Sequence, residues 1–148
     1  MADLLNQALA EGSILVRAQA SNWKQSLELA GSALERSNRT TNEYTKAMVS
    51  AFEELGPYMV IAPGIALAHA RPSEAVLSTG LSLVTLSEPV PFGNTTNDPV
   101  SLVIGLSAVD HDSHIELMAA LSEFLMDVMK VNMLLQATNL EEVRTLFS

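Results

Sequence analysis

The 148-residue chain contains no cysteine. Disulfide bonds, thiolate metal ligands and cysteine nucleophiles are therefore excluded, and the composition fits a reducing compartment. The chain also lacks a long apolar run, because its most apolar stretch, residues 59–68, is interrupted by Pro63 and Gly64. A membrane-spanning helix needs about 20 apolar residues. The first residues carry no basic segment of the kind that begins a signal peptide, so we expect a soluble, cytoplasmic protein.

Positive charge is scarce as well. The chain has 8 Lys and Arg residues against 17 Asp and Glu residues, which gives a formal net charge of −9. A nucleic-acid-binding protein needs clustered Lys and Arg to contact phosphates, so nucleic acid is not an expected partner. An acidic surface suits a protein partner with a basic face.

The length and the apolar content predict one domain. Hydrophobic residues make up 48% of the chain, which is enough to build a buried core. A chain of this length is typical of a single domain. No internal repeat or linker divides the sequence, so we expect residues 1–148 to form one domain.

The period of the apolar residues changes along the chain. It is helical towards both ends, whereas the middle alternates as strands do. The order of helices, strands and helices predicts an α/β sandwich, in which a small mixed sheet is flanked by helices on both faces. We expect helices over residues 3–11, 22–36, 40–55 and 113–130 and after Asn139, and strands over residues 14–17, 58–61, 67–70, 77–86 and 100–109.

Three residue pairs have the spacing of a capping box that begins a helix. These pairs are Thr40–Glu43, Ser113–Glu116 and Asn139–Glu142. The second pair places His114 in the first turn of its helix. The helix dipole there disfavours an imidazolium, so we expect a neutral ring. Met118, Leu121 and Leu125 share its helical face, which should turn His114 towards the sheet or its rim.

His69 and Arg71 form the second candidate group. Arg71 is the only Lys or Arg between residues 47 and 129, and it lies two residues after His69. Along an extended segment such residues point to the same side. An imidazole nucleophile beside a permanently charged, planar donor suits a phosphate or a carboxylate.

Each candidate also has a structural interpretation. His69 and His114 can be hydrogen-bonded core or capping residues, and Arg71 can pair with Glu74 on the surface. A zinc site made by His69, His111 and His114 is a further alternative. The second capping box leaves His111 outside the helix, however, and no His-Glu-x-x-His motif occurs, so we expect neither a metal nor another cofactor.

The methionines of the C-terminal half are interpreted as core-filling residues. Some of them lie in an apolar segment, residues 126–133, which can alternatively form a homodimer contact. The methionines in question are Met118, Met126, Met129 and Met133.

Two stretches carry a resemblance to a known family. They are GPYMVIAPGIALAHARP, residues 56–72, and GLSLVTLSEPVPFGNTTNDPVSLVIGLSAVDHDSHIELMAALSEFL, residues 80–125. In this order and spacing they resemble the EIIA component of the bacterial phosphoenolpyruvate-dependent sugar phosphotransferase system. The similarity is to its mannitol/fructose class, and within that class to the ascorbate-type branch.

The resemblance implies a phosphoryl carrier. His69 matches the histidine that accepts a phosphoryl group on Nε2 from the phosphocarrier HPr, and His114 matches the histidine that hydrogen-bonds the phosphate. The next acceptor would be a cysteine of an EIIB component, followed by sugar entering through the membrane component EIIC. Arg71 is the candidate phosphate clamp. A regulatory module of the same fold, like the nitrogen-type EIIA proteins, is the alternative.

Small residues surround the proposed acceptor. Ala66, Ala68 and Ala70 flank His69, and Ala68 stands where this family usually has proline. We interpret the three alanines as lowering the walls of the site, so that a partner's phosphohistidine can come within attack distance.

Overall fold

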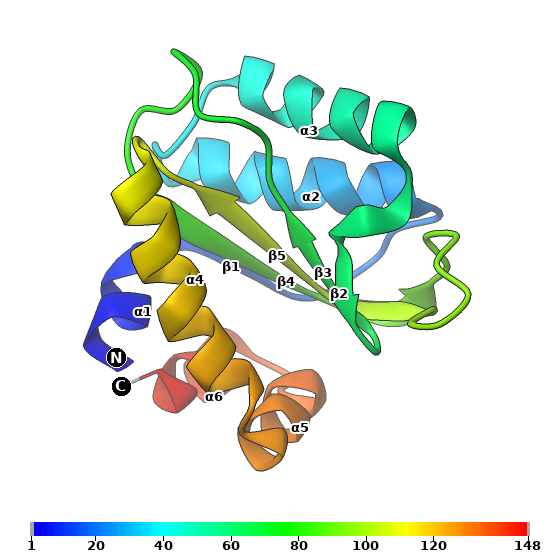
Figure 1. The fold of residues 1–148 in the computed structure, drawn as a ribbon. Coiled ribbons are helices and arrows are strands. Elements are labelled where there is room, and N and C mark those ends of the chain that lie inside the picture. The colour runs from blue at the N-terminus through cyan, green and yellow to red at the C-terminus, as the bar shows by residue number, and fades with distance from the viewer. Residues whose placement is uncertain (1, 148) are drawn as a thin grey trace.

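An open sheet lies between two helical layers in the computed structural model, which describes residues 2–147 (Figure 1). The elements in chain order are α1 (Ala2–Ala8), β1 (Leu9–Ala18), α2 (Trp23–Arg36), α3 (Asn42–Leu55), the 3-10 helix η1 (Pro57–Met59), β2 (Val60–Ala62), β3 (Ile65–Ala68), β4 (Gly80–Val90), β5 (Val100–Ser107), α4 (His111–Leu125), α5 (Val128–Gln136) and α6 (Leu140–Leu146). Within the described range, the sheet has five strands in the order β1-β4-β5-β3-β2. β1 is parallel to β4 and β3 is parallel to β5, whereas the β4–β5 and β2–β3 pairs are antiparallel.

Helices cover both faces of this mixed sheet, which confirms the predicted fold class. α2 and α3 pack on one face, and α1 and α4 to α6 lie on the other (Figure 1). The side chains of β3 alternate between the two layers. Ile65 and Leu67 join the apolar core on the α4 side, while Ala66 and Ala68 join the core beneath α2 and α3. This alternation determines which of the two helical layers each residue of β3 faces.

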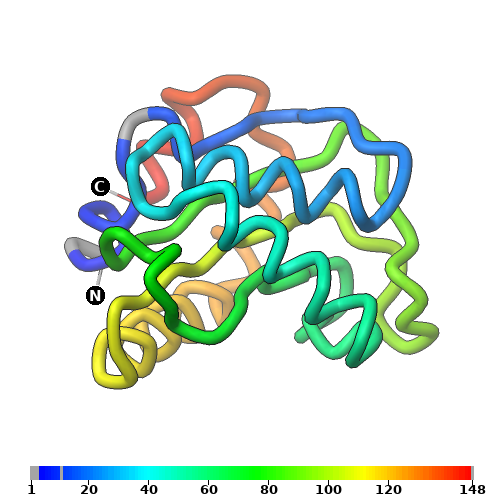
Figure 2. Tube along the Cα trace, turned by 90° about the horizontal axis from the view of Figure 1, so that it is seen from above, coloured from blue at the N-terminus to red at the C-terminus, as the bar shows by residue number. Residues whose placement is uncertain are grey.

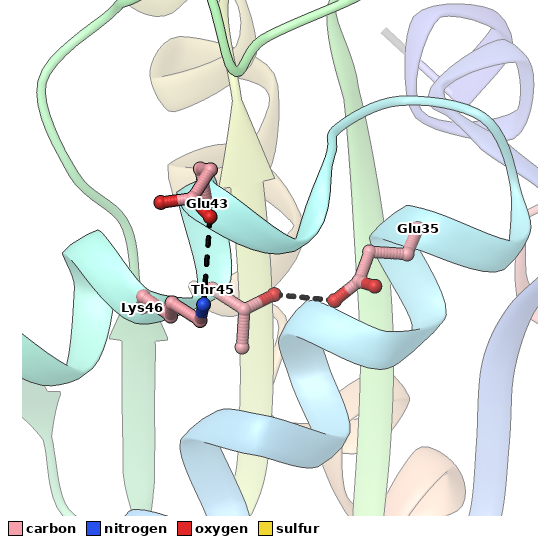
Figure 3. Close-up of polar contacts among 4 residues, drawn as sticks. All are labelled: Glu35, Glu43, Thr45 and Lys46. Atoms are coloured by element: carbon pink, nitrogen blue, oxygen red, sulfur yellow. Dashed lines mark hydrogen bonds and ion pairs between the residues drawn. The ribbon is translucent and has the colours of Figure 1, made fainter.

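α2 and α3 approach each other closely at Gly31. A Cβ atom at this position would overlap the side chain of Thr45. The Thr45 hydroxyl donates a hydrogen bond to Glu35 Oε2 over 2.7 Å, which links the two helices (Figure 3). The neighbouring ion pair between Lys46 and Glu43, at 3.4 Å, is exposed and therefore adds little stability.

The N-terminal elements differ from the prediction. The helix expected over residues 3–11 ends at Ala8, and β1 begins at Leu9. Leu9 pairs with Leu81 of β4, so residues 9–11, which were expected to be helical, belong to a strand instead. Gly12 has φ +85° and lies inside β1 at a register shift, where it accommodates an irregularity of the strand.

Two of the three predicted capping boxes are wrong. α3 is capped at Thr41, because the backbone of Thr40 makes a bridge with Val76. α4 is capped by Asp110, whose carboxylate accepts a hydrogen bond from Ser113 N over 2.8 Å. The cap therefore lies three residues before the expected one, and the helix begins at His111.

The third capping box is confirmed at Asn139, which accepts a hydrogen bond from Glu142 N over 2.9 Å. The strands of the centre exist, with bounds shifted by up to four residues from those expected. The helix expected to continue to Lys130 breaks at residues 126–127, where Asp127 caps α5.

The core-filling interpretation is wrong for three of the four methionines. Met126, Met129 and Met133 are 82%, 76% and 55% exposed, whereas Met118 packs against the core. The break after α4 turns α5 outwards, and among its described residues only Leu134 is fully buried. The homodimer contact at this segment stays a prediction. None of the helices within residues 2–147 has both the length and the apolar character to cross a membrane.

The close contact of α2 with α3 is testable by Gly31→Ala. The new methyl group should force the helices apart and lower the free energy of unfolding by about 1–2 kcal/mol, since overpacking outweighs the helix propensity of alanine. Adding Thr45→Ala removes the two closest atoms, Oγ1 and Cγ2, and leaves only the Cβ contact, so the double variant should be more stable than the sum of the two single effects predicts. Urea denaturation of all four proteins measures this coupling; strictly additive effects would contradict it.

Candidate functional site

The three histidines of the chain meet at one cleft of about 500 Å³. The segment that follows β3, green in Figure 2, passes beside the start of α4, in yellow. These segments lie side by side because β3 and β5 are parallel neighbours, so that the chain leaves both at the same edge of the sheet. The cleft is lined by Ala51, Leu55, Tyr58, His69, Ala70, Arg71, Pro72, His111 and His114.

His69 directly follows the last residue of β3 and is half-buried. Its Nδ1 lies 3.0 Å from the carbonyl oxygen of Leu67. A carbonyl can only accept a hydrogen bond, so Nδ1 carries a proton, and in the neutral ring the free lone pair is then on Nε2. Leu67 is itself paired with Ile104 of β5, which gives this hydrogen bond a rigid anchor.

His114 lies opposite, in the first two turns of α4. The centroids of the His69 and His114 rings are 6.2 Å apart. Burial lowers the pKa of His114, and the nearby His69 and His111 lower it further. The predicted neutral ring therefore agrees with the structure, although burial rather than the helix terminus is the main cause. A neutral imidazole at this place can donate one N–H bond into the cleft.

His111 is the first residue of α4, whereas the sequence analysis placed it outside the helix. The displacement follows from the cap, because Asp110 rather than Ser113 begins the helix. The hydrogen bond from Ser113 N lowers the pKa of Asp110 and keeps this exposed carboxyl ionised. Among the described residues, no group of three or more His, Cys, Asp or Glu side chains is arranged to bind a metal ion.

Arg71 is exposed and lines the same cleft, on the side expected from its spacing to His69. The surface pairing with Glu74 that the sequence left open is not formed, since the Lys46–Glu43 pair is the sole ion pair among the described side chains. The guanidinium is thus available to a ligand. It brings the only permanent positive charge among the residues that line the cleft.

Two tyrosines belong to the site and were missed. Tyr58 places its ring edge-on to His69, with centroids 5.7 Å apart, and forms one wall of the cleft. Tyr44 lies behind the cleft, where its hydroxyl contacts the backbone of Ala70. In the sequence Tyr44 belongs to an apolar helical stripe and is indistinguishable from an ordinary core residue.

The interpretation of the alanines is wrong for two of the three. Ala66 and Ala68 are fully buried in the core beneath α2 and α3, so they do not line the cleft. Alternation along β3 explains this, because residues on either side of Leu67 face the opposite layer. Only Ala70 borders the cleft beside His69. Small residues at positions 66 and 68 serve the packing of the helical layer instead.

Comparison with known proteins places this arrangement in a family. The family described as "Phosphoenolpyruvate-dependent sugar phosphotransferase system, EIIA 2" matches residues 7–148. The chain belongs to this family. A similar protein, the ascorbate-specific PTS system EIIA component of Escherichia coli strain K12, is 41% identical over 113 residues, which are 76% of this chain and 73% of that protein.

Solved structures of EIIA proteins agree with this membership. The mannitol-specific cryptic phosphotransferase enzyme IIA CmtB from Escherichia coli is 36% identical, with a TM-score of 0.87 over 97% of both chains. The complex of enzyme IIA and phosphorylated enzyme IIB for mannitol, also from Escherichia coli, matches at 27% identity. Its TM-score is 0.81 over 93% of this chain and 95% of that chain. The predicted family is confirmed, and as an EIIA component the protein is a phosphoryl carrier for sugar uptake.

The lowered pKa of His114 predicts a pH-dependent stability. Below the ordinary value of 6.5 the unfolded chain binds a proton that the folded His114 resists, so the free energy of unfolding falls as the pH falls through this range. His114→Gln should therefore lose less stability than the wild type between pH 7.5 and 5.5, measured by urea denaturation. His111→Gln removes only the smallest of the three causes of this lowered pKa, so its loss should lie between those of the wild type and His114→Gln, and closer to the wild type. Equal losses in wild type and His114→Gln would refute the prediction.

Proposed function

We propose that this protein accepts a phosphoryl group from phospho-HPr on Nε2 of His69 and passes it to the cysteine of an EIIB component, during uptake of ascorbate or a pentitol-like sugar. The observation that supports this most is the hydrogen bond from His69 Nδ1 to the Leu67 carbonyl. It leaves Nε2 as the nucleophilic nitrogen of a residue that lines an open cleft.

Both transfer steps use the same nitrogen. The lone pair of Nε2 attacks phosphorus, and the new N–P bond forms as the N–P bond of the donor's phosphohistidine breaks. Nδ1 keeps its proton, so the phosphorylated ring carries a positive charge, and its N–H bond to Leu67 becomes charge-assisted. When the EIIB thiolate attacks phosphorus, the Nε2–P bond breaks and His69 returns to its neutral form.

Three groups can stabilise the phosphoryl oxygens. The neutral His114 ring offers an N–H donor, and the Arg71 guanidinium offers two donors in a planar arrangement. The third is the N-terminus of α4, whose residues His111 and His114 line the same cleft and where the helix dipole favours an anion. Such fixed donors are the main source of catalysis in phosphoryl transfer.

The sugar and the partners are inferred from the relatives. Similar EIIA components carry the name ascorbate-specific, which supports ascorbate as the sugar of this system. A solved complex joins a mannitol EIIA to a phosphorylated EIIB, which supports an EIIB acceptor here. The membrane component EIIC would then be an indirect partner, and transfer would take place in the cytoplasm.

Intact mass at alkaline pH tests the acceptor. After incubation with phosphoenolpyruvate, enzyme I and HPr, the wild type should gain one phosphoryl group, and the gain should disappear on acidification as expected of a phosphohistidine. His69→Ala should gain none, while His111→Gln, altered at an exposed neighbour, should gain one. His114→Ala should be phosphorylated more slowly. Phosphorylation of His69→Ala would show that another residue is the acceptor.

Addition of EIIB then separates the carrier from a regulatory module of the same fold. A carrier loses its phosphoryl group to the EIIB cysteine of the ascorbate system. Retention of the group in the presence of that EIIB, together with binding of other partners, would favour the regulatory alternative.

Arg71→Gln tests the phosphate clamp. Loss of the guanidinium should lower the rate of transfer from phospho-HPr by about tenfold or more, because one donor to the transferred group is removed. Arg71→Lys keeps the charge without the planar pair of donors and should recover only part of the rate. Arg36→Gln removes an exposed cation at the end of α2 and should leave the rate unchanged. Rapid-quench kinetics measure all four proteins; a wild-type rate for Arg71→Gln would exclude the clamp.

A further inference from the structure

Tyr44 places a buried hydroxyl directly behind the reactive segment. The residue belongs to α3 and is 1% exposed. Its hydroxyl accepts a hydrogen bond from Ala70 N over 3.0 Å and donates to the carbonyl of Leu106 in β5 over 2.7 Å. The Ala70 carbonyl lies farther from the hydroxyl, at 3.2 Å. One side chain thus connects α3, β5 and the residue after His69.

The Tyr44 hydroxyl supplies a hydrogen bond just beyond the end of the pairing between β3 and β5. Pairing between β3 and β5 ends at Ala68 opposite Gly105, so Ala70 lies beyond the sheet. Without Tyr44, the backbone N–H of Ala70 would have no partner among the described hydrogen bonds. The hydroxyl bridges the gap and joins this N–H to Leu106, which follows Gly105 in β5. Through this contact the chain stays attached to β5 at Ala70, beyond Ala68, the last residue of β3.

His69 is consequently fixed on both sides. On one side Leu67 is paired with β5 and receives the hydrogen bond from His69 Nδ1. On the other side Ala70 is held by Tyr44. A ring whose backbone is held both before and after it cannot turn without breaking one of these bonds. Phosphoryl transfer requires an in-line approach of donor and acceptor, so a fixed direction of Nε2 bears directly on rate.

We propose that Tyr44 is a positioning residue for phosphoryl transfer, whose hydroxyl holds the chain at Ala70 against β5 and thereby fixes the direction of the His69 ring. The inference rests on the proposed role of His69 as acceptor. Burial raises the pKa of Tyr44 above its ordinary value of 10.0, so the hydroxyl is protonated and keeps its donated bond at neutral pH.

Tyr44→Phe removes this hydroxyl and keeps the ring that fills the core. Thr85→Val is the matched control, because the buried Thr85 hydroxyl also accepts a backbone N–H bond, from Arg17 over 2.8 Å, in a strand away from the cleft. Both variants leave one backbone N–H without its acceptor, and Tyr44→Phe also removes the bond to Leu106, so it should lose somewhat more stability than Thr85→Val.

We expect Tyr44→Phe to lower the maximal rate of transfer from phospho-HPr by about tenfold or more, with the concentration of phospho-HPr at half-maximal rate changed less than twofold. Thr85→Val should transfer at the wild-type rate. Nitrogen-15 spectra of the unphosphorylated proteins should show His69 moving from a pure Nδ1–H form to a mixture of tautomers in Tyr44→Phe only. The amide of Ala70 should exchange with solvent at least tenfold faster in that variant.

A wild-type rate and unchanged His69 resonances in Tyr44→Phe overturn the positioning role and leave the proposed function intact. If the wild type itself accepts no phosphoryl group, the proposed function fails, and the His69 resonances still decide whether Tyr44 fixes the ring. If Tyr44→Phe does not fold, amide exchange of the wild type decides. Protection of Ala70 comparable to that of β5 supports the bridge, and fast exchange overturns it.

Discussion

The parallel pairing of β3 with β5 is the interaction on which the site depends. Two parallel strands end at the same edge of the sheet, so the residues that follow them are brought together although they are about 40 positions apart in sequence. His69 follows β3, and the start of α4, with His111 and His114, follows β5. The same pairing fixes Leu67, whose carbonyl sets the tautomer of His69. The position and the tautomer of the His69 ring thus have one origin.

The residues of the site could be recognised from the sequence because reactive side chains are rare in it. His69, His114 and Arg71 stand out in a chain with few histidines and few cations, and the structure brings all three to one cleft. The helices and the α/β class followed from the change in apolar period, which needs no knowledge of long-range contacts.

The parts that could not be predicted depend on contacts between distant segments. Leu9 belongs to a strand because Leu81 pairs with it, and Thr40 is excluded from the cap of α3 because Val76 bridges it. The roles of Ala66 and Ala68 depend on which layer each side of β3 faces. Tyr44 has the helical spacing of a core residue, and only the fold shows that its hydroxyl reaches the segment after β3. Local pattern decides the type of an element, whereas long-range pairing decides its ends and the polar partners.

The proposed relay uses one nitrogen of the cleft, Nε2 of His69, and this has a consequence for how the relay is ordered. If both phosphoryl donor and acceptor must reach Nε2 of His69, they compete for one surface and cannot be bound together. Transfer then proceeds by alternating encounters, in which each partner leaves before the next arrives. Accumulated acceptor that carries no phosphoryl group would occupy the cleft and slow the phosphorylation of the carrier. The rate of this phosphorylation would then depend on the demand for sugar through simple competition.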